Sequence, residues 1–378
     1  MKRMNTTTSL YILSGIMLAA AFLLGIWFGV RPLASRSVGS VGIEDAGTAS
    51  SQQTDACQFR SRLNGVCVSS EDETHPDVVL VMIENHFESW PQSGLSDASI
   101  VYEAPTEGNI TRFLAVYPLG VAVHKAGPVR SARPYFLSWA LEYGKPLYFH
   151  VGGSNDALGK IRNQGNITDV DEFFRAQYFW RSRDRLAPHN TYTSSTLWES
   201  AAHANSRAAD AALGDAGVWQ FTSALSEAER EIYPDAGKIT VSFAPPTYEA
   251  VWMYASSTGA YERQQMKKSH RDEDGRLIRA ETVAVMHVKS RVLDDVGRLS
   301  IETIGKGTGV VFRDGQAITG EWRKMGETDR TRWYDNDGNE IAFKPGHIWI
   351  EVVPQTGGVS FESRYHPLPP PSQGGDSE

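Results

Sequence analysis

The stretch VYEAPTEGNITRF, residues 101 to 113, places two glutamates, Glu103 and Glu107, on either side of a proline. When two carboxylates lie together near an apolar wall, the like charge raises one pKa and leaves the other group ionised. Such a pair can provide the general acid and the second carboxylate that cleavage of a glycosidic bond requires. The alternative is that both are solvated residues of a turn, or are paired with a nearby arginine.

Three arginines are candidate ligand contacts for an anion. Arg112 is expected on the strand that returns from the turn, and Arg130 and Arg133 lie in GPVRSARPYF. Ser131 is the expected N-cap of a helix, where free backbone N–H groups already favour an anion. The guanidinium groups could hold a carboxylate or phosphate of a ligand, or Glu103 and Glu107 themselves. Both alternatives predict that these segments meet in the fold.

Two further motifs contain candidate ligand-binding residues. Glycines that follow a strand let a ligand approach the backbone, although they can equally form a tight turn. Histidines beside turn residues are candidate site residues, although a lone histidine more often has a structural role. The motifs HVGGSND and APHNTY supply His150, Gly152, Gly153, Ser154, His189 and Asn190.

No spacing in the sequence predicts a metal or a cofactor. A site built from His150, His189 and Asp156 has no ligand spacing to support it. The sequence also has no Walker A loop, no nucleophile elbow, no histidine pair at zinc-protease spacing and no cysteine pair at zinc spacing. We therefore predict no cofactor and no metal ligands.

The elements that must position these residues change in character near residue 235. In residues 76 to 235, VVLVMIE (78–84) is typical of a buried strand, and PTEGN is the expected loop of a hairpin. A helix is expected to contain Pro134 in its first turn and to end at Gly144. The alternation of strands and helices predicts a mixed α/β domain.

Residues 236 to 354 contain alternating strand patterns separated by turn signals, which predicts a mainly antiparallel β domain. The expected fold class is therefore α+β. Residues 355 to 378 are rich in proline and glycine and are expected to form a disordered tail.

The N-terminus predicts a membrane anchor. Residues 9 to 30 are apolar and uncharged, which is enough to span the bilayer as a helix after a short cytoplasmic segment, residues 1 to 8. The flanking Lys and Arg residues balance, so charge does not decide the orientation. Residues 31 to 75 form the expected linker and contain both cysteines, Cys57 and Cys67. A disulfide there fits an extracytoplasmic location, and the alternative is two reduced thiols.

The net charge of −8, without a run of lysine or arginine, argues against nucleic acid as a partner. The expected contacts are the cytoplasmic membrane, through residues 9 to 30, and a cell-wall glycan or an envelope protein.

The segments VLVMIEN, WPQSGLSDASIVYEAPTEGNITRFLAVYP, KAGPVRSARPYF, HVGGS, APHNTY and DNDGNEIAFKPGHIWIEVVP resemble the YerB-like family of bacterial envelope proteins, a domain of unknown function. The resemblance implies an exported, membrane-anchored protein with an N-terminal α/β part and a C-terminal β part. It carries over no catalytic residue. Typical members have a lipid-bearing cysteine after the signal sequence, whereas no cysteine precedes Cys57 here. Trp90 and Asn109 stand where arginine and glycine are usual.

Two functional hypotheses follow. The first is an anchored enzyme that cleaves or remodels a glycan such as peptidoglycan, like a glycosidase or a lytic transglycosylase. Glu103 would be its general acid and Glu107 its second carboxylate, while the arginines would orient an anionic group. The second is a non-catalytic binding or scaffolding protein, in which the same cluster recognises an anionic ligand or is structural.

Overall fold

The computed structural model describes residues 57–163, 165–205, 217–244 and 247–363. The predicted cytoplasmic segment, the membrane anchor, most of the linker and the part of the predicted tail from residue 364 lie outside these ranges. The first part of that tail was wrongly predicted to be disordered, because Gly358–Glu362 form a β-strand. Within the described ranges, no helix combines the length and the apolar character needed to cross a membrane. The predicted disulfide is confirmed, because Cys57 and Cys67 are bonded, with their Cα atoms 5.5 Å apart.

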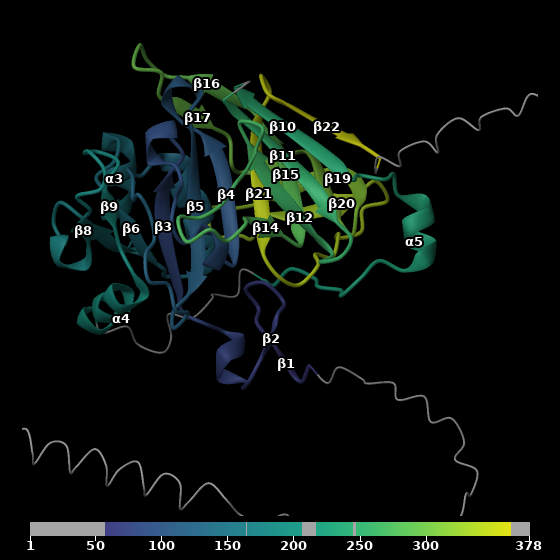
Figure 1. Cartoon of the computed structure of the whole chain (residues 1–378), viewed down its shortest axis with the longest axis horizontal. Coiled ribbons are helices and arrows are strands. Elements are labelled where there is room, and N and C mark those ends of the chain that lie inside the picture. The colour runs from purple at the N-terminus through teal and green to yellow at the C-terminus, as the bar shows by residue number, and fades with distance from the viewer. Residues whose placement is uncertain (1–56, 164, 206–216, 245–246, 364–378) are drawn as a thin grey trace, which may run out of the picture. The chain divides into compact units, whose positions relative to one another are not determined.

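A central sheet of ten strands dominates the fold (Figure 1). Its strand order is β20 (Arg332–Asp335), β19 (Gln316–Lys324), β18 (Gly305–Arg313), β15 (Thr282–Val288), β21 (Ile348–Pro354), β4 (Ile100–Pro105), β5 (Thr111–Pro118), β3 (Val78–Glu84), β6 (Leu147–His150) and β7 (Thr168–Asp171). Strands from both parts of the sequence form this sheet, because β21 pairs in parallel with both β15 and β4. The predicted boundary near residue 235 thus separates neighbouring strands of one sheet.

A second sheet packs against one face of the first. It has the order β13 (Lys268–Ser269), β12 (Ala260–Gln265), β11 (Tyr248–Ala255), β10 (Lys238–Ala244) and β22 (Gly358–Glu362), with β14 (Arg279–Ala280) also paired to β12. Three short pairs complete the described strands: β1 (Phe59–Arg60) with β2 (Cys67–Val68), β8 (Trp180–Arg181) with β9 (Thr191–Tyr192), and β16 (Ser290–Val292) with β17 (Leu299–Ile301).

The described helices are few, so the described part of the chain is mainly β-sheet. The α-helices are α2 (Pro134–Ala140), α3 (Asn155–Asn163), α4 (Ser195–Ala204) and α5 (Glu227–Ile232). The 3-10 helices are η1 (Asp72–Thr74), η2 (Phe87–Ser89), η3 (Leu95–Asp97), η4 (Glu107–Asn109), η5 (Leu141–Tyr143) and η6 (Ala176–Tyr178).

The central sheet has a hydrophobic core on each face. Successive residues of a strand point to opposite faces, and β3 shows this directly: Val79, Val81 and Ile83 belong to one core, and Val78, Leu80 and Met82 to the other. The first core also contains residues of α4 and of the second sheet, and the second core contains residues of α2 and α3. The apolar run VVLVMIE is therefore a fully buried strand, as predicted.

The segment around α2 differs from the sequence prediction at its start. The helix ends as expected, because α2 continues into η5 and stops at Gly144, whose φ is 71°. Ser131 was wrongly predicted as the N-cap, which is Arg133. The cause is a β-bridge between Ala132 and Gly153, which keeps the chain extended until Pro134.

Candidate functional site

Several of the predicted site residues lie at one edge of the central sheet. Strands β3, β4 and β6 run parallel to one another, so their carboxyl ends lie at the same edge. In open sheets with helices this edge is a common place for ligands. The edge receives Glu84 from β3, Glu107 from the loop after β4, and His150 from β6.

The hairpin that carries the two predicted carboxylates is confirmed. Strands β4 and β5 pair antiparallel, with Pro105 opposite Thr111. Asn109, the residue that replaces a glycine usual in the family, has a φ of 59°, a left-handed conformation that asparagine tolerates better than most residues. The loop is closed by the backbone N–H and the hydroxyl of Thr106, which both donate to the carbonyl of Ile110.

Glu107 forms the internal ion pair that was one of the two predicted alternatives. Its two carboxylate oxygens accept hydrogen bonds from Nε and Nη2 of Arg133 at 2.6 and 2.9 Å. Burial raises the pKa of Glu107, but the hydrogen bonds and the charge of Arg133 outweigh it, so the pKa lies below its usual value. Glu107 is therefore ionised at neutral pH, and Arg133 occupies both of its carboxylate oxygens.

Glu103 lies elsewhere, inside the first hydrophobic core. Val101 of the same strand belongs to that core, and residues two apart in a strand share a face. Arg112 is two residues before Leu114 in β5, and Leu114 belongs to the core on the other face of the sheet. Arg112 and Glu103 therefore point to opposite faces of the sheet. The two predicted carboxylates thus have different environments and different partners.

A buried polar network holds Glu103. The side chains of Glu103 and Arg263 are each only 1% exposed, and Nη2 of Arg263 lies 2.7 Å from Oε2 of Glu103. The other oxygen of Glu103 accepts from Thr111 at 2.7 Å and from Asn85 at 3.3 Å. Arg263 also donates to Gln265 and contacts His270. Burial, and then the charge of Arg263, lower the pKa of His270, which is therefore neutral.

A second carboxyl group lies beside Glu103. Glu351 of β21 is its register partner in the parallel pair β21 and β4, and is fully buried. Burial, and then the charge of Glu103, raise the pKa of Glu351 well above its usual value. Glu351 therefore carries a proton at neutral pH, while Glu103 is the anion that faces Arg263.

The arginines of the edge form a compact cluster, which we call the arginine edge: Arg112, Arg130 and Arg133. Nε of Arg130 lies 2.9 Å from Oε1 of Glu84, and Arg133 holds Glu107. Arg112 donates to the backbone carbonyl of Ser131 and forms no ion pair with any described residue. Burial, and then the charge of Arg133, lower the pKa of Arg112 to about 10. The arginine edge therefore holds three cations against two carboxylates.

The segments HVGGS and GPVRSARPYF lie side by side. The backbone N–H of Val151 donates to Arg130, and that of Ala132 donates to Gly152. Gly152 has a φ of 57°, and a Cβ atom there would lie 2.7 Å from the ring of Phe173, so the position needs glycine. Gly153 forms the bridge with Ala132.

The remaining predicted residues make internal contacts. His150 is fully buried between the carbonyl of Gly152 and the carboxylate of Asp169, both at 2.8 Å. The hydroxyl of Ser154 accepts the backbone N–H of Ala157 at the start of α3, as expected of a cap. Asn190 binds Arg181 and the carbonyl of Ser182. Each of these three side chains therefore has partners within the protein itself.

His189 belongs to a group that the sequence analysis missed. Among the described residues, one set of three metal-type side chains has its ligand atoms within 4.8 Å of one another: His86, Glu88 and His189. The H-x-E spacing directly after a buried strand is the local signal that could have indicated it. His150 and Asp156, considered with His189 from the sequence, are not in this set.

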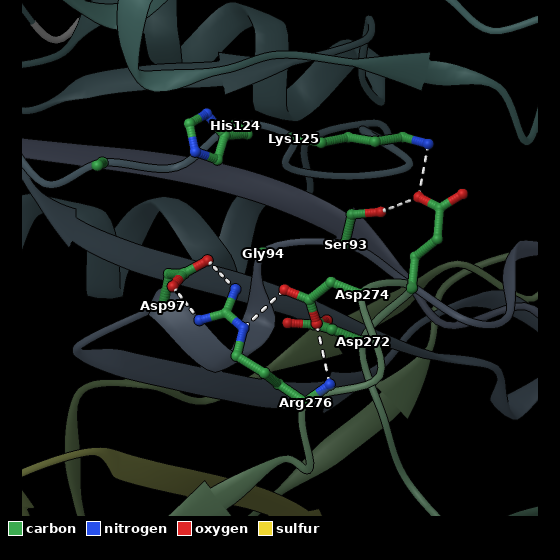
Figure 2. Close-up of a pocket in the computed structure, with 10 residues that line it drawn as sticks. Ser93, Gly94, Asp97, His124, Lys125, Asp272, Asp274 and Arg276 are labelled. Carbon is green, nitrogen blue, oxygen red and sulfur yellow. Dashed lines mark hydrogen bonds and ion pairs between the residues drawn. The ribbon is translucent and has the colours of Figure 1, made fainter. Parts of the chain in front are cut away.

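A cavity of about 530 Å³ lies away from the arginine edge, lined by residues near 93–97, 122–125 and 272–276. Figure 2 shows Arg276 between Asp97 and Asp274, with which it forms ion pairs. Burial raises the pKa of Asp272 in the cavity wall to about 6, although it accepts hydrogen bonds from Ser96. The charged groups here pair mainly with one another, so we assign no ligand to the cavity.

Comparisons with known proteins match both parts of the chain to one family. Residues 63–208 match the family described as "Protein of unknown function (DUF3048) N-terminal domain", and residues 239–350 match its C-terminal domain. A relative from Bacillus subtilis, "Putative lipoprotein YerB", is 28% identical over 320 residues, which cover 82% of this chain and 93% of the relative. The crystal structure of the YerB protein from Bacillus subtilis is similar with a TM-score of 0.69 and 26% identity, and covers 80% of this chain and 99% of that chain.

Proposed function

This chain belongs to the DUF3048 family of proteins of unknown function, as its resemblance to YerB predicted, and we propose that it is a non-catalytic binding protein of the cell envelope. The name of its relative, a putative lipoprotein, supports a location at the membrane. The disulfide between Cys57 and Cys67 supports an extracytoplasmic environment. We assign the anchoring role to residues 9 to 30, which span a membrane once in this proposal.

The arginine edge is the binding element, and Arg112 is the observation that carries the proposal. A buried guanidinium normally has a carboxylate or phosphate partner, because an uncompensated charge in a low dielectric is costly. Arg112 is 7% exposed and lies beside two other arginines, and among the described residues its side chain donates only to the backbone carbonyl of Ser131. One further anion would complete the charge balance of the arginine edge. The side chains of Arg130 and Arg133 are 25% and 15% exposed, which gives a ligand access.

The burial and the partners of Glu103 and Glu107 support a binding function and not glycan cleavage. A general acid must reach the leaving oxygen of its substrate within hydrogen-bond distance. Glu103 is 1% exposed and is held by Arg263, and Glu107 is held in a fork by Arg133. We therefore propose an anionic polymer of the cell wall as the ligand, and not a glycan that is cut.

Binding to cell walls tests this proposal. The full-length protein is expected to sediment with purified walls that retain their anionic polymers, and to release them as salt screens the charges. Replacing Arg130 and Arg133 by glutamine should weaken binding at least about tenfold, because a hydrogen bond to a charged group contributes roughly 1.5 to 3 kcal/mol. Arg279→Gln, which changes an exposed arginine paired with Glu262, should bind like the wild type. Equal binding of the double variant would refute the arginine edge as the ligand site.

Incubation with purified peptidoglycan tests the enzyme hypothesis directly. We expect no soluble fragments above the buffer background from the wild type, from Glu103→Gln or from Glu107→Gln, with mass spectrometry as the measurement and a lytic enzyme as the positive control. Fragments from the wild type that disappear in Glu107→Gln would replace the binding proposal with a catalytic one.

A further inference from the structure

The group His86, Glu88 and His189 is built from two segments that meet beyond the end of β3. The chain leaves β3 at Glu84 and turns into η2, which places His86 and Glu88 on the same turn. His189 comes from the segment that precedes β9. Nη1 of Arg185 donates to the carbonyl of Ser89, and Nη2 donates to the carbonyl of Pro91, so the two segments are tied together.

The distances within this group suit a metal ion. Nε2 of His189 lies 3.0 Å from Oε2 of Glu88, and Nδ1 of His86 lies 3.6 Å from the same oxygen. Ligand atoms about 2.0 to 2.2 Å from a tetrahedral zinc ion lie roughly 3.3 to 3.6 Å apart. The two imidazole rings are stacked, with centroids 4.9 Å apart and an interplanar angle of 13°. The two separations from Glu88 are thus close to those of a tetrahedral ion, and all the ligand atoms of the group lie within 4.8 Å of one another.

The carboxylate of Glu84 orients the ring of His189, as carboxylates commonly do for histidines that bind metal ions. Nδ1 of His189 lies 2.8 Å from Oε2 of Glu84, whose other oxygen is held by Arg130. An ionised carboxylate only accepts hydrogen bonds, so Nδ1 of His189 donates to Glu84, and Nε2 is the ring nitrogen that faces Glu88 and is available to a metal ion. Metal-binding histidines almost always donate their second N–H to such a partner.

We propose that His86, Glu88 and His189 form a binding site for a divalent transition metal such as Zn²⁺. Two imidazoles and one carboxylate are ligands that zinc accepts, and three protein ligands leave a fourth position open. The side chain of Glu88 is 56% exposed, so this position is accessible from solvent and takes water or an oxyanion. The proposal does not depend on the function of the arginine edge, although Glu84 links the two.

Titration of the tag-free, full-length protein with Co²⁺ after treatment with a chelator tests this site. We expect saturation at one ion per chain, visible absorption typical of a tetrahedral or five-coordinate ion, and displacement by Zn²⁺. Glu88→Gln and His189→Ala should abolish the absorption, and Glu84→Gln should weaken binding about 10-fold to 100-fold through its contact with His189. His203→Ala, which removes an exposed histidine from the last turn of α4, is the matched control and should titrate like the wild type.

Thermal unfolding provides a readout that does not depend on the spectrum. An ion that binds only the folded state raises the unfolding temperature. Zn²⁺ should raise it in the wild type and in His203→Ala, and should leave it unchanged in Glu88→Gln, whose exposed substitution preserves the fold. The proposal is refuted if the wild type shows no saturable Co²⁺ absorption, or if Glu88→Gln binds Co²⁺ as tightly as His203→Ala.

Discussion

Replacing Glu103 and Glu351 together by glutamine is expected to lower the free energy of unfolding by about 3 to 5 kcal/mol. The change leaves the guanidinium of Arg263 buried without a carboxylate, and that is the costly way to break a buried ion pair. Both glutamates must be changed. If only Glu103 is replaced, the neighbouring Glu351 can lose its proton and take over the charge opposite Arg263.

Denaturation with urea, followed by tryptophan fluorescence, measures this effect. Glu351→Gln alone is the matched control, because it replaces a protonated carboxyl group by a neutral amide and keeps the anion on Glu103. It should cost about 1 kcal/mol, the net contribution of an ordinary hydrogen bond. Adding Arg263→Met to the double variant should recover much of the loss, since a buried pair replaced by apolar groups is often tolerated. A double variant as stable as the control would contradict the assigned charges.

Glu142→Gln is expected to cost about 3 to 5 kcal/mol as well, on the opposite face of the sheet. Nζ of Lys324 lies 3.0 Å from the carboxylate of Glu142, and both side chains are fully buried. The same carboxylate also accepts from the hydroxyl and the backbone N–H of Thr331. The substitution removes the charge that Lys324 needs and weakens these hydrogen bonds.

A double-mutant cycle with Lys324→Met isolates the pair. The coupling energy should be about 2 to 3 kcal/mol, in the upper part of the range for residues in contact. The control is the same cycle on Glu327 and Lys160, which pair on the surface. Both side chains are about two-fifths exposed, and such pairs contribute roughly 0 to 1 kcal/mol. A coupling energy no larger than that of the exposed pair would show that the buried lysine is not charged.

Local sequence patterns predicted the elements at the arginine edge well. The apolar run of β3, the hairpin between β4 and β5, and the helix stop at Gly144 depend on residues close in sequence. The ion pair between Arg133 and Glu107 was one of two alternatives that the sequence left open. The sequence could not decide between this ion pair and a bound ligand, because an arginine binds the carboxylate of a side chain and the carboxylate of a ligand in the same way.

Longer-range contacts could not be predicted. Arg263, the partner of Glu103, is 160 residues away in the sequence and lies in β12, whose mainly polar sequence, AYERQQ, was not predicted as a strand. Ser131 resembles a helix cap by type, but the bridge between Ala132 and Gly153 decides the local backbone. His86 and Glu88 are candidate ligands because the fold places His189 beside them, and this contact cannot be read from the sequence.

The position of β21 has a consequence for the order of assembly. This strand lies between β15 and β4 in the middle of the central sheet, yet it is the last of the ten strands of that sheet to be synthesised. Until residue 354 has been made, β4 and β15 each present an unpaired edge, and such edges invite pairing with other chains. The central sheet is therefore completed at its centre, and the nascent chain depends on protection from aggregation until β21 has been synthesised.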